Sequence, residues 1–404
     1  MTGSGRVAVA GGGAAALSSA LLLAQAGREV VLIDPAPARS TGDPSTWCVA
    51  QIRHPHGMLG KGLAVLSEHL PAVLDRLQRI GGTVVSLLQG GGPPVDTLLM
   101  ERWMLDAALR AEIARAGAVR VLTGSRLVDV TATGRTACAH VRRPGGSMAL
   151  TAACVVDATG THGRIWSAES TVSREEHGSS RDFHSVRHRL LPGARVPPLS
   201  RVVTGRMNLS DGAEASIIRG PGDVFHAVVS CGPRWPMRRR LRDPGFHAAL
   251  FRGVPELGPW TFPESSTPTS PVLSFASRGD QWVSVPGEVT AVVRAGDALF
   301  TTNPAHGRGL SHALSQSLML ARALGRGDDV RVGVAAYRDE VRERLRPWFD
   351  DSVLLDDATP EGAAHRARLA RLKEPAARDP RLHRLMLERH HLLGDSTLPS
   401  LATN

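Results

Sequence analysis

The stretch RVAVAGGGAAALSSALLLAQAGREVVLID, residues 6–34, decides the fold of this chain. Its pattern predicts a short buried strand, a glycine turn, a helix that ends at Gly27 and a second strand that ends at Asp34. The turn fits G-x-G-x-x-G/A, in which Gly11 permits a tight turn and Gly13 lets the backbone approach a pyrophosphate. This order of elements predicts a Rossmann-like dinucleotide-binding domain.

The helix after the turn begins with Ala14 and Ala15. Its free backbone N–H groups and partial positive charge favour phosphates, and the small residue Ala16 lets helix and strand pack closely. Asp34 follows at the position where an acidic side chain binds a ribose diol and repels a ribose phosphate. We therefore expect the pocket to take NAD or FAD rather than NADP.

A second glycine-rich turn, GDALFTTNPAHGRGL (residues 296–310), favours FAD. FAD carries a ribityl chain and a flavin, which need a second site far along the chain, whereas an NAD dehydrogenase needs only the first unit. Asp297 is placed to bind ribityl hydroxyls or to approach the pyrophosphate through water, and the following helix N-terminus can stabilise negative charge on reduced flavin. The residues expected at this end are Asp297, Pro304, Gly307, Gly309 and Leu310.

Composition limits the other possibilities. The chain has 404 residues, of which 42% are hydrophobic and 21% charged, so two soluble domains are expected, without a signal peptide or membrane helix, in the cytoplasm. The net charge is +10, but only Lys61 and Lys373 are lysines among 48 basic residues. This arginine bias indicates genome composition, and we expect no nucleic-acid partner.

Two further composition signals concern metals and redox state. The four cysteines form no C-x-x-C pair, so reduced thiols are expected. The histidines of His54-Pro55-His56 have no third ligand at a recognisable spacing, so no metal site is predicted.

The hydrophobic periodicity gives an α/β fold with a discontinuous FAD-binding domain over residues 1–168 and 289–330. Short strands between glycine- and proline-rich turns predict a β-rich substrate domain over residues 169–288, and a helical C-terminal segment spans residues 331–404. Residues 45–57 and 264–271 are expected to be loops.

These stretches resemble the FAD-dependent monooxygenases of the p-hydroxybenzoate hydroxylase-like superfamily, with motifs more similar to the branch of styrene monooxygenases and polyether epoxidases. The resemblance covers most of residues 5–350 and is specific in GGGAAA with Asp34, in QIRHPHGML, in the arginine that begins the helix at 102, and in GDALFTTNPAHGRG. It implies that Arg53 and His54 lie beside the flavin or ribityl chain. It also implies that Arg102 reaches the ribityl–phosphate region and that Val128 lines the adenine pocket.

Two departures from that pattern bear on mechanism. DATG (residues 157–160) stands where the aromatic hydroxylases have a D-G segment associated with NAD(P)H use. We therefore expect a separate flavin reductase, with direct reduction by NAD(P)H as the alternative. His306 and Arg308 stand where the epoxidase branch usually has an aromatic residue and a glutamine, and His306 either assists proton transfer or caps a helix.

The resemblance implies that reduced flavin reacts with O₂ and that one oxygen atom enters a small apolar molecule of secondary metabolism, by epoxidation or hydroxylation. No catalytic side chain is assigned, because such chemistry belongs to the cofactor. An FAD-dependent dehydrogenase or saturase, a halogenase and a non-redox cyclase on the same scaffold remain alternatives. The halogenases' catalytic lysine and W-x-W-x-I-P signature are missing.

Overall fold

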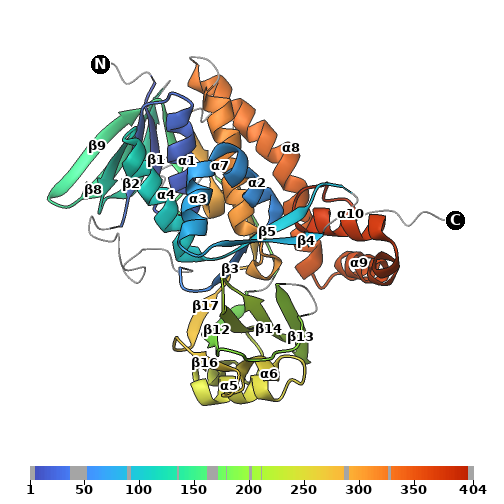
Figure 1. Ribbon diagram of the computed structural model, residues 1–404. Coiled ribbons are helices and arrows are strands. Elements are labelled where there is room, and N and C mark those ends of the chain that lie inside the picture. The colour runs from blue at the N-terminus through green and yellow to red at the C-terminus, as the bar shows by residue number, and fades with distance from the viewer. Residues whose placement is uncertain are drawn as a thin grey trace.

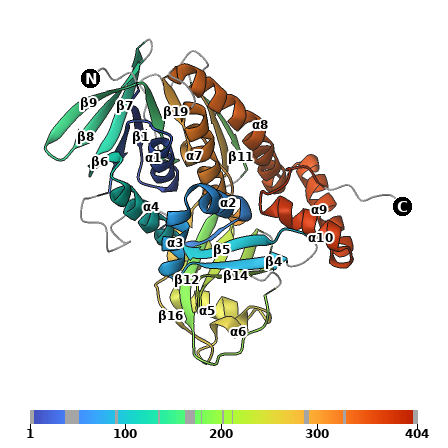
Figure 2. The ribbon, with the colours of Figure 1, turned by 45° about the horizontal axis from the view of Figure 1, so that its top comes forward.

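The computed structural model describes residues 5–36, 52–88, 92–133, 136–161, 172–178, 180–199, 203–210, 212–285, 291–325 and 329–398. An upper lobe of sheets and helices stands on a smaller lower lobe, and the C-terminal helices lie at one side (Figures 1 and 2). No helix in the described ranges is long and apolar enough to cross a membrane.

A parallel sheet forms the centre of the upper lobe. Helices cover one face and a second sheet covers the other, and the strands are buried except for the edge strand β6 (Val119–Thr123). Valine, alanine and isoleucine dominate these strands, as expected for a parallel sheet that is covered on both faces. The strand order is β19 (Val292–Arg294), β10 (Cys154–Asp157), β1 (Val7–Ala10), β2 (Val30–Asp34) and β6 (Val119–Thr123). The α/β fold with a Rossmann-like domain is confirmed.

Side-chain alternation along β1 separates two cores. Val7 and Val9 pack with α1 (Ala14–Gln25), α4 (Arg102–Ala116) and α7 (Gly309–Gly325) on one face. Ala8 and Ala10 pack on the other face against a second, antiparallel sheet. Its strands are β7 (Arg126–Thr133), β8 (Thr136–Arg143) and β9 (Gly146–Ala152).

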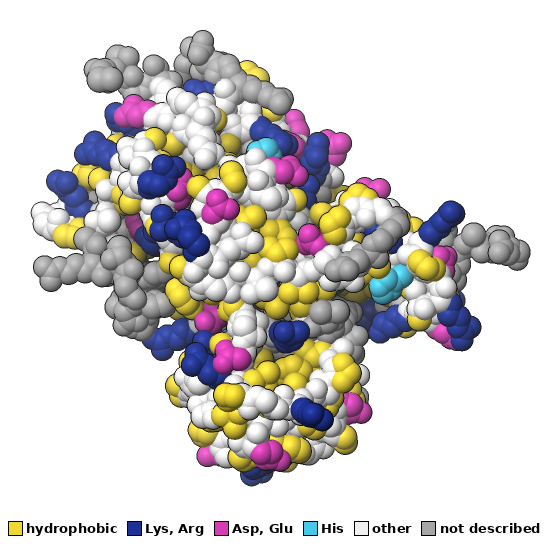
Figure 3. All heavy atoms as spheres, viewed as in Figure 1, with side chains coloured by type: hydrophobic (Ala, Val, Ile, Leu, Met, Phe, Trp, Pro, Cys, Tyr) yellow, Lys and Arg dark blue, Asp and Glu magenta, His cyan; other side chains and the backbone are white. Residues whose placement is uncertain are grey.

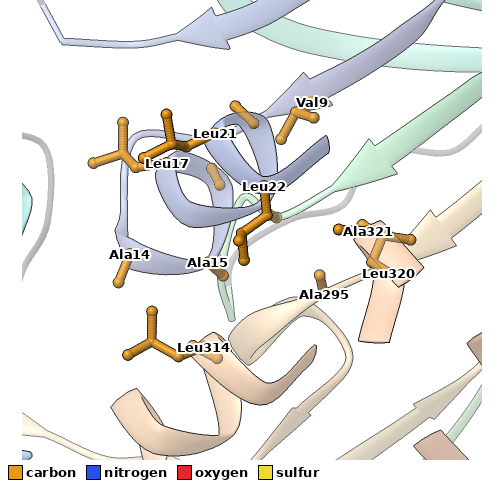
Figure 4. Packing of buried hydrophobic residues seen from close by; sticks show 14 of the residues in the cluster. Val9, Ala14, Ala15, Leu17, Leu21, Leu22, Ala295, Leu314, Leu320 and Ala321 are labelled. Atoms are coloured by element: carbon orange, nitrogen blue, oxygen red, sulfur yellow. The ribbon is translucent and has the colours of Figure 1, made fainter. Parts of the chain in front are cut away.

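Helices α1 and α7 pack against each other, and Figure 4 shows Ala14 and Ala15 of α1 near Leu314 of α7. The hydroxyl oxygen of Ser18, in the first half of α1, lies 2.7 Å from that of Ser317, midway along α7. Just after the C-terminus of α1, Nε of Arg28 donates to the carbonyl of Leu324, in the last turn of α7, at 2.6 Å. The two contacts mean that the helices run in the same direction, so their N-termini point to the same side of the molecule.

A third sheet lies below the parallel one and carries helices α2 (Gly60–His69) and α3 (Pro71–Arg79). Its strand order is β3 (Pro55–Met58), β5 (Val95–Glu101) and β4 (Thr83–Leu88). The expected loop at residues 45–57 is therefore wrong at its end, because residues 55–57 pair with β5. Residues 45–51 lie outside the described ranges.

The lower lobe is an antiparallel sheet whose one face packs on η3 (Arg238–Arg242), α5 (Pro244–Arg252) and α6 (Gly258–Thr261). The strands are β13 (Thr204–Ser210), β14 (Ala213–Arg219), β15 (Val224–Cys231), β12 (Asp182–Leu190), β16 (Ser266–Pro268) and β17 (Leu273–Ala276). The β-rich character of this segment was expected, but its helices were not.

The expectation of a loop at residues 264–271 is wrong as well. Residues 266–268 form β16, which pairs with β12. The polar residues in it are satisfied by long-range bonds, since the Ser266 hydroxyl donates to the carbonyl of Trp260 at 2.7 Å and the Ser265 carbonyl accepts from the Leu191 N–H at 2.9 Å. A serine-rich composition therefore did not distinguish a loop from a strand here.

A small sheet joins the lobes in the order β11 (Ser173–His177), β18 (Asp280–Ser284) and β20 (Phe300–Thr301). Two short 3₁₀ turns, η4 (Gly296–Ala298) and η5 (Pro304–His306), flank β20. The chain ends in three helices, as expected. They are α8 (Val330–Asp356), α9 (Pro360–Arg378) and α10 (Pro380–His390).

Candidate functional site

The predicted site residues gather at the carboxyl edge of the parallel sheet. Gly11 follows β1, Asp34 ends β2, Asp157 ends β10, and Asp297 comes three residues after β19. The register pairs Ala10 with Asp157, so these ends lie side by side. Ligands of open α/β sheets bind outside this edge.

The α1 turn, Gly11–Gly13, has the geometry of an anion-binding turn. Gly11 has φ of 138°, and a Cβ at this position would overlap the carbonyl oxygen of Ala158. Gly13 is the N-cap of α1, and no described side chain caps the helix there, so its first N–H groups remain available to a ligand. Ala14 and Ala15 are buried and contribute their backbone to this helix end.

Asp34 lies where the sequence predicted it but is already engaged. Its carboxylate is fully buried and forms an ion pair with Arg110 of α4, and Oδ1 also accepts the Ala36 N–H at 2.9 Å. Arg110 in turn donates to the carbonyl of Gly12 at 2.9 Å. Asp34, which the sequence analysis expects to bind the ribose, is thus paired with an arginine that the sequence analysis did not identify.

Arg110 is one of three charged residues at spacings of four along α4, with Arg102 and Asp106. Residues spaced by four share a helix face, and this face is turned into the protein, because Arg102 and Asp106 are buried. Nε of Arg102 lies 3.3 Å from Oδ1 of Asp106, and burial raises the pKa of Asp106 despite the arginine. This row of charges on one inward-facing side of the helix is the signal that could have revealed Arg110.

Asp297 lies close to the start of α1. Its side chain is exposed, yet desolvation by the surrounding protein raises its pKa, against the opposing effect of Arg102. Gly296 has φ of 64° and donates its N–H to Oε1 of Gln316 on α7 at 2.6 Å. A Cβ on Gly296 would come within 2.6 Å of the Ala15 Cβ, so only glycine lets Asp297 lie this close to α1.

The histidines of β3 and its flank face different partners. Nδ1 of His54 lies 3.0 Å from the Ser185 hydroxyl on β12, so His54 contacts the lower lobe. His56 is half-buried, and burial followed by the charge of Arg102 lowers its pKa to about 3. Burial and the nearby His226 lower the pKa of His54 to about 4. Both rings are therefore neutral at neutral pH.

Two residues taken from the resemblance lie at the periphery. Arg53 is exposed beside His54. Val128 is 43% exposed and is the unpaired residue of a β-bulge in β7, between Leu127 and Asp129. A bulge re-aims a side chain out of the regular sheet, so Val128 is available to line a pocket at the outer end of the site.

The α7 turn, Asn303–Gly309, forms the other end of the site. Pro304, Gly307 and Gly309 are exposed, whereas Leu310 is buried. The Asn303 side chain caps η5 by accepting the Ala305 N–H at 3.0 Å. No atom of the described residues lies within 4 Å of a Cβ built on Gly307 or Gly309, so open space lies beside both glycines.

Side chains from distant elements hold this turn in place. Arg308 is buried and donates to Asp351 of α8 at 2.7 Å and to the Ser352 hydroxyl at 2.9 Å. Arg206 of β13 donates to the Ala305 carbonyl at 3.0 Å, which joins the lower lobe to the turn. The sequence analysis identified none of these supporting residues.

The arrangement fits FAD. The parallel helices α1 and α7 direct the positive ends of their dipoles to the same side, one suited to a pyrophosphate and the other to an anionic flavin ring. Asp297 is exposed and directly follows Gly296, which lies against Ala15 at the start of α1, so its carboxyl group would be available to accept hydrogen bonds from ribityl hydroxyls.

These features define a dinucleotide-binding flavoprotein fold, and sequence comparison agrees. Residues 6–176 match the family described as FAD dependent oxidoreductase. This match spans less than half of the 404 residues, and it supports FAD as the cofactor. A comparison with curated proteins gave no significant match.

Solved structures confirm the fold over nearly the whole chain. The flavin-dependent brominase Bmp2 has a TM-score of 0.71 at 15% identity, covering 93% of this chain and 92% of the brominase. The p-nitrophenol 4-monooxygenase PnpA from Pseudomonas putida DLL-E4 has a TM-score of 0.64 at 17% identity, covering 97% and 98%. The Diels-Alderase PyrE3 of the pyrroindomycin pathway has a TM-score of 0.67 at 15% identity, covering 98% and 82%.

Proposed function

We propose that this chain is an FAD-dependent monooxygenase that inserts one oxygen atom from O₂ into a small apolar substrate, by epoxidation or hydroxylation. The observation that carries the proposal is the position of the α7 turn against the lower-lobe sheet, to which the hydrogen bond from Arg206 to the Ala305 carbonyl ties it. A substrate on that sheet face would lie next to the flavin end of the cofactor.

The sheet face in question is the one turned away from α5 and α6. Along β14, Ala213, Ala215 and Ile217 are buried in the helix-covered core, so Glu214, Ser216 and Ile218 occupy the opposite face. The register places Phe183, Val228 and Phe275 on that same face. Figure 3 shows hydrophobic side chains gathered on the lower lobe where it meets the upper one. These apolar side chains support a small apolar substrate.

Bound FAD supplies the redox chemistry and the reaction with O₂, and the protein binds, orients and excludes water. The N–H groups of the α1 turn would hold the pyrophosphate and Asp297 the ribityl hydroxyls. The N-terminus of α7 would stabilise negative charge on the pyrimidine end of the flavin. His54 and His56 stay neutral at neutral pH, so they place hydrogen-bonding nitrogens near the substrate face without a fixed charge.

The comparisons support this reading without selecting one substrate. The structural neighbours include p-nitrophenol 4-monooxygenase and aklavinone-11 hydroxylase bound to FAD and aklavinone. A brominase reaction is disfavoured because the chain has only two lysines. Lys373 is exposed on helix α9, and Lys61 lies on α2 in a GKG context unrelated to the halogenase motifs. On its motifs, we place the chain nearest the branch of styrene monooxygenases and polyether epoxidases.

Oxygen labelling tests the proposed reaction. The protein, loaded with FAD and supplied with a separate flavin reductase and NADH, is incubated under ¹⁸O₂ with a panel of alkenes and electron-rich arenes. Mass spectrometry is expected to show one ¹⁸O atom per product molecule. Product formed equally well without O₂ would instead support a non-redox cyclase, for which the likeness to the Diels-Alderase is the supporting observation. Loss of two hydrogens without labelling would support a dehydrogenase.

The electron source is part of the same proposal. The dinucleotide motif that the sequence analysis identified ends at Asp34, which pairs with Arg110, and DATG replaces the segment associated with nicotinamide use, so a separate flavin reductase is the proposed partner. Anaerobic stopped-flow mixing with NADH or NADPH is expected to bleach the flavin slowly, and adding a reductase is expected to accelerate it. Rapid bleaching by either nicotinamide alone would contradict a separate partner.

A further inference from the structure

Asn303, the first residue of the α7 turn, is held by two carboxyl groups from different elements. Its backbone N–H donates to Oδ1 of Asp280 on β18 at 2.9 Å, and its side-chain Nδ2 donates to Oδ1 of Asp356 on α8 at 3.0 Å. The side-chain oxygen of Asn303 also caps η5 by accepting the Ala305 N–H. Asn303 therefore connects both carboxyl groups to the turn by hydrogen bonds.

Asp280 is 1% exposed, and its second oxygen, Oδ2, is buried without a hydrogen-bond partner among the described residues. An ionised carboxylate in this place would leave a buried charged oxygen unsatisfied, next to a second carboxyl group. Burial and the Asp356 carboxylate raise the pKa of Asp280 to about 7. Burial also acts to raise the pKa of Asp356, but His306 and Asn303 outweigh it and lower the pKa. Of the two, Asp280 is therefore the group that carries a proton.

The other groups around Asp280 do not neutralise it. Nε2 of His306 lies 3.3 Å from Oδ1 of Asp356 and therefore serves that carboxylate. Arg308, at the start of α7, is paired with Asp351. His177 lies opposite Asp280 in the β11–β18 register, and its ring is 2.8 Å from Oε1 of Glu175.

We propose that Asp280 and Asp356 are positioning residues for FAD, which hold the α7 turn in its cofactor-binding geometry while they share one proton. A proton on Oδ2 of Asp280 converts the unsatisfied acceptor into a donor for Asp356, so the pair carries one negative charge rather than two. The inference rests on the proposed role of the α7 turn at the flavin end.

FAD binding and this proton are linked. Pro304, Gly307 and Gly309 are exposed in the free turn, so a flavin on them removes water from above the carboxyl pair. Further desolvation raises the pKa of Asp280 beyond about 7, and the bound form holds the proton more tightly than the free form. The sign follows from linkage. Affinity is highest below pH 7 and falls as pH rises through the bound-state pKa, by at most about tenfold per pH unit for one proton.

The experiment is a titration of the full-length apoprotein with FAD between pH 6 and pH 9, followed by flavin fluorescence. The wild type is expected to lose affinity by about tenfold over this range. Asp280→Asn keeps a carbonyl oxygen for the Asn303 N–H and an amide donor for Asp356, so its affinity is expected to be independent of pH. Asp356→Asn removes a neighbouring charge that raises the pKa of Asp280, so the fall in affinity is expected to move to lower pH. Asp350→Asn is the matched control, because this exposed residue of α8 pairs with Arg346 and should behave as the wild type.

The possible outcomes distinguish a failure of the shared-proton inference from a failure of the proposed FAD site. FAD that binds the wild type with the same affinity at pH 6 and pH 9 overturns the shared proton and leaves the FAD site intact. A pH dependence that survives in Asp280→Asn overturns it as well, even if Asp356→Asn fails to fold. A folded wild type that binds no FAD at any pH overturns the proposed site together with this inference.

Discussion

The α1 turn and the α7 turn both precede a helix that points at the site, yet they are built differently. Residues 11–13 form the α1 turn, which lies between two neighbouring elements and is shaped mainly by backbone contacts, such as the close approach of Gly11 to Ala158. The α7 turn depends on side chains from β13, β18 and α8, which are remote in sequence. The first turn takes its shape from its own backbone, with Ala158 and Arg110 as remote contacts, whereas several remote side chains hold the second, so substitutions far from the site should damage the second more.

The largest expected effect is at Asp351, the support of the α7 turn. This buried carboxylate pairs with Arg308, Arg389 and His365, so Asp351→Ala leaves buried arginines without their anion. Removing one partner of a buried ion pair costs about 3–5 kcal/mol. Urea unfolding should show this loss, and FAD affinity should fall with it. The exposed neighbour Asp350→Ala is the control, and equal losses for the two variants would contradict a special role for Asp351.

Gly11→Ala breaks the α1 turn. The new methyl group would overlap the Ala158 carbonyl, and φ of 138° is strained for alanine, so the free energy of unfolding should drop by about 3 kcal/mol. Gly27→Ala has a comparable positive φ of 84° but meets no atom within 4 Å, so it should lose only about 1 kcal/mol. Chemical denaturation of both proteins measures the difference, and similar losses would mean that the overlap with Ala158 is relieved.

Asp297→Ala tests the expected hydrogen bonds between Asp297 and the ribityl chain of FAD. It removes an acceptor for ribityl hydroxyls, and a charge-assisted hydrogen bond contributes about 1.5–3 kcal/mol, so FAD affinity should fall by about tenfold or more. Stability should not fall, because burial raises the pKa of this carboxyl in the free protein. Flavin titration and thermal unfolding give the two readings. Unchanged affinity would remove Asp297 from the site.

Arg206→Gln should have the smallest effect. The exposed Arg206 contributes one hydrogen bond to the Ala305 carbonyl, which is worth about 1 kcal/mol at most, so FAD affinity should fall only a few-fold. Arg195→Gln, in the same lobe but away from the turn, is a suitable comparison for flavin titration. A loss as large as that of Asp297→Ala would show that the lower lobe controls the turn more strongly than this one contact suggests.

The same contrast explains what could be predicted from the sequence. The strand, turn and helix from β1 to β2 and the helix after Gly309 follow from local spacing, and the structure has them where they were expected. The Arg110 partner of Asp34 left only an indirect signal, the four-residue spacing on α4. Asp280, Asp356 and Arg206 left none, because each reaches the α7 turn through a contact that only the folded chain creates.

The parallel packing of α1 and α7 also fixes the distance between the pyrophosphate end and the flavin end of the site. Ser18 contacts Ser317 midway along α7, and Arg28 bonds Leu324 in the last turn of α7, so neither helix can slide along the other without breaking these contacts. The separation between the pyrophosphate end and the flavin end is then a property of the protein rather than of the ligand. A mononucleotide such as FMN would reach the flavin end but leave the ribose pocket at Asp34 unfilled. Discrimination between FAD and FMN would therefore arise in part from the distance between two helix ends.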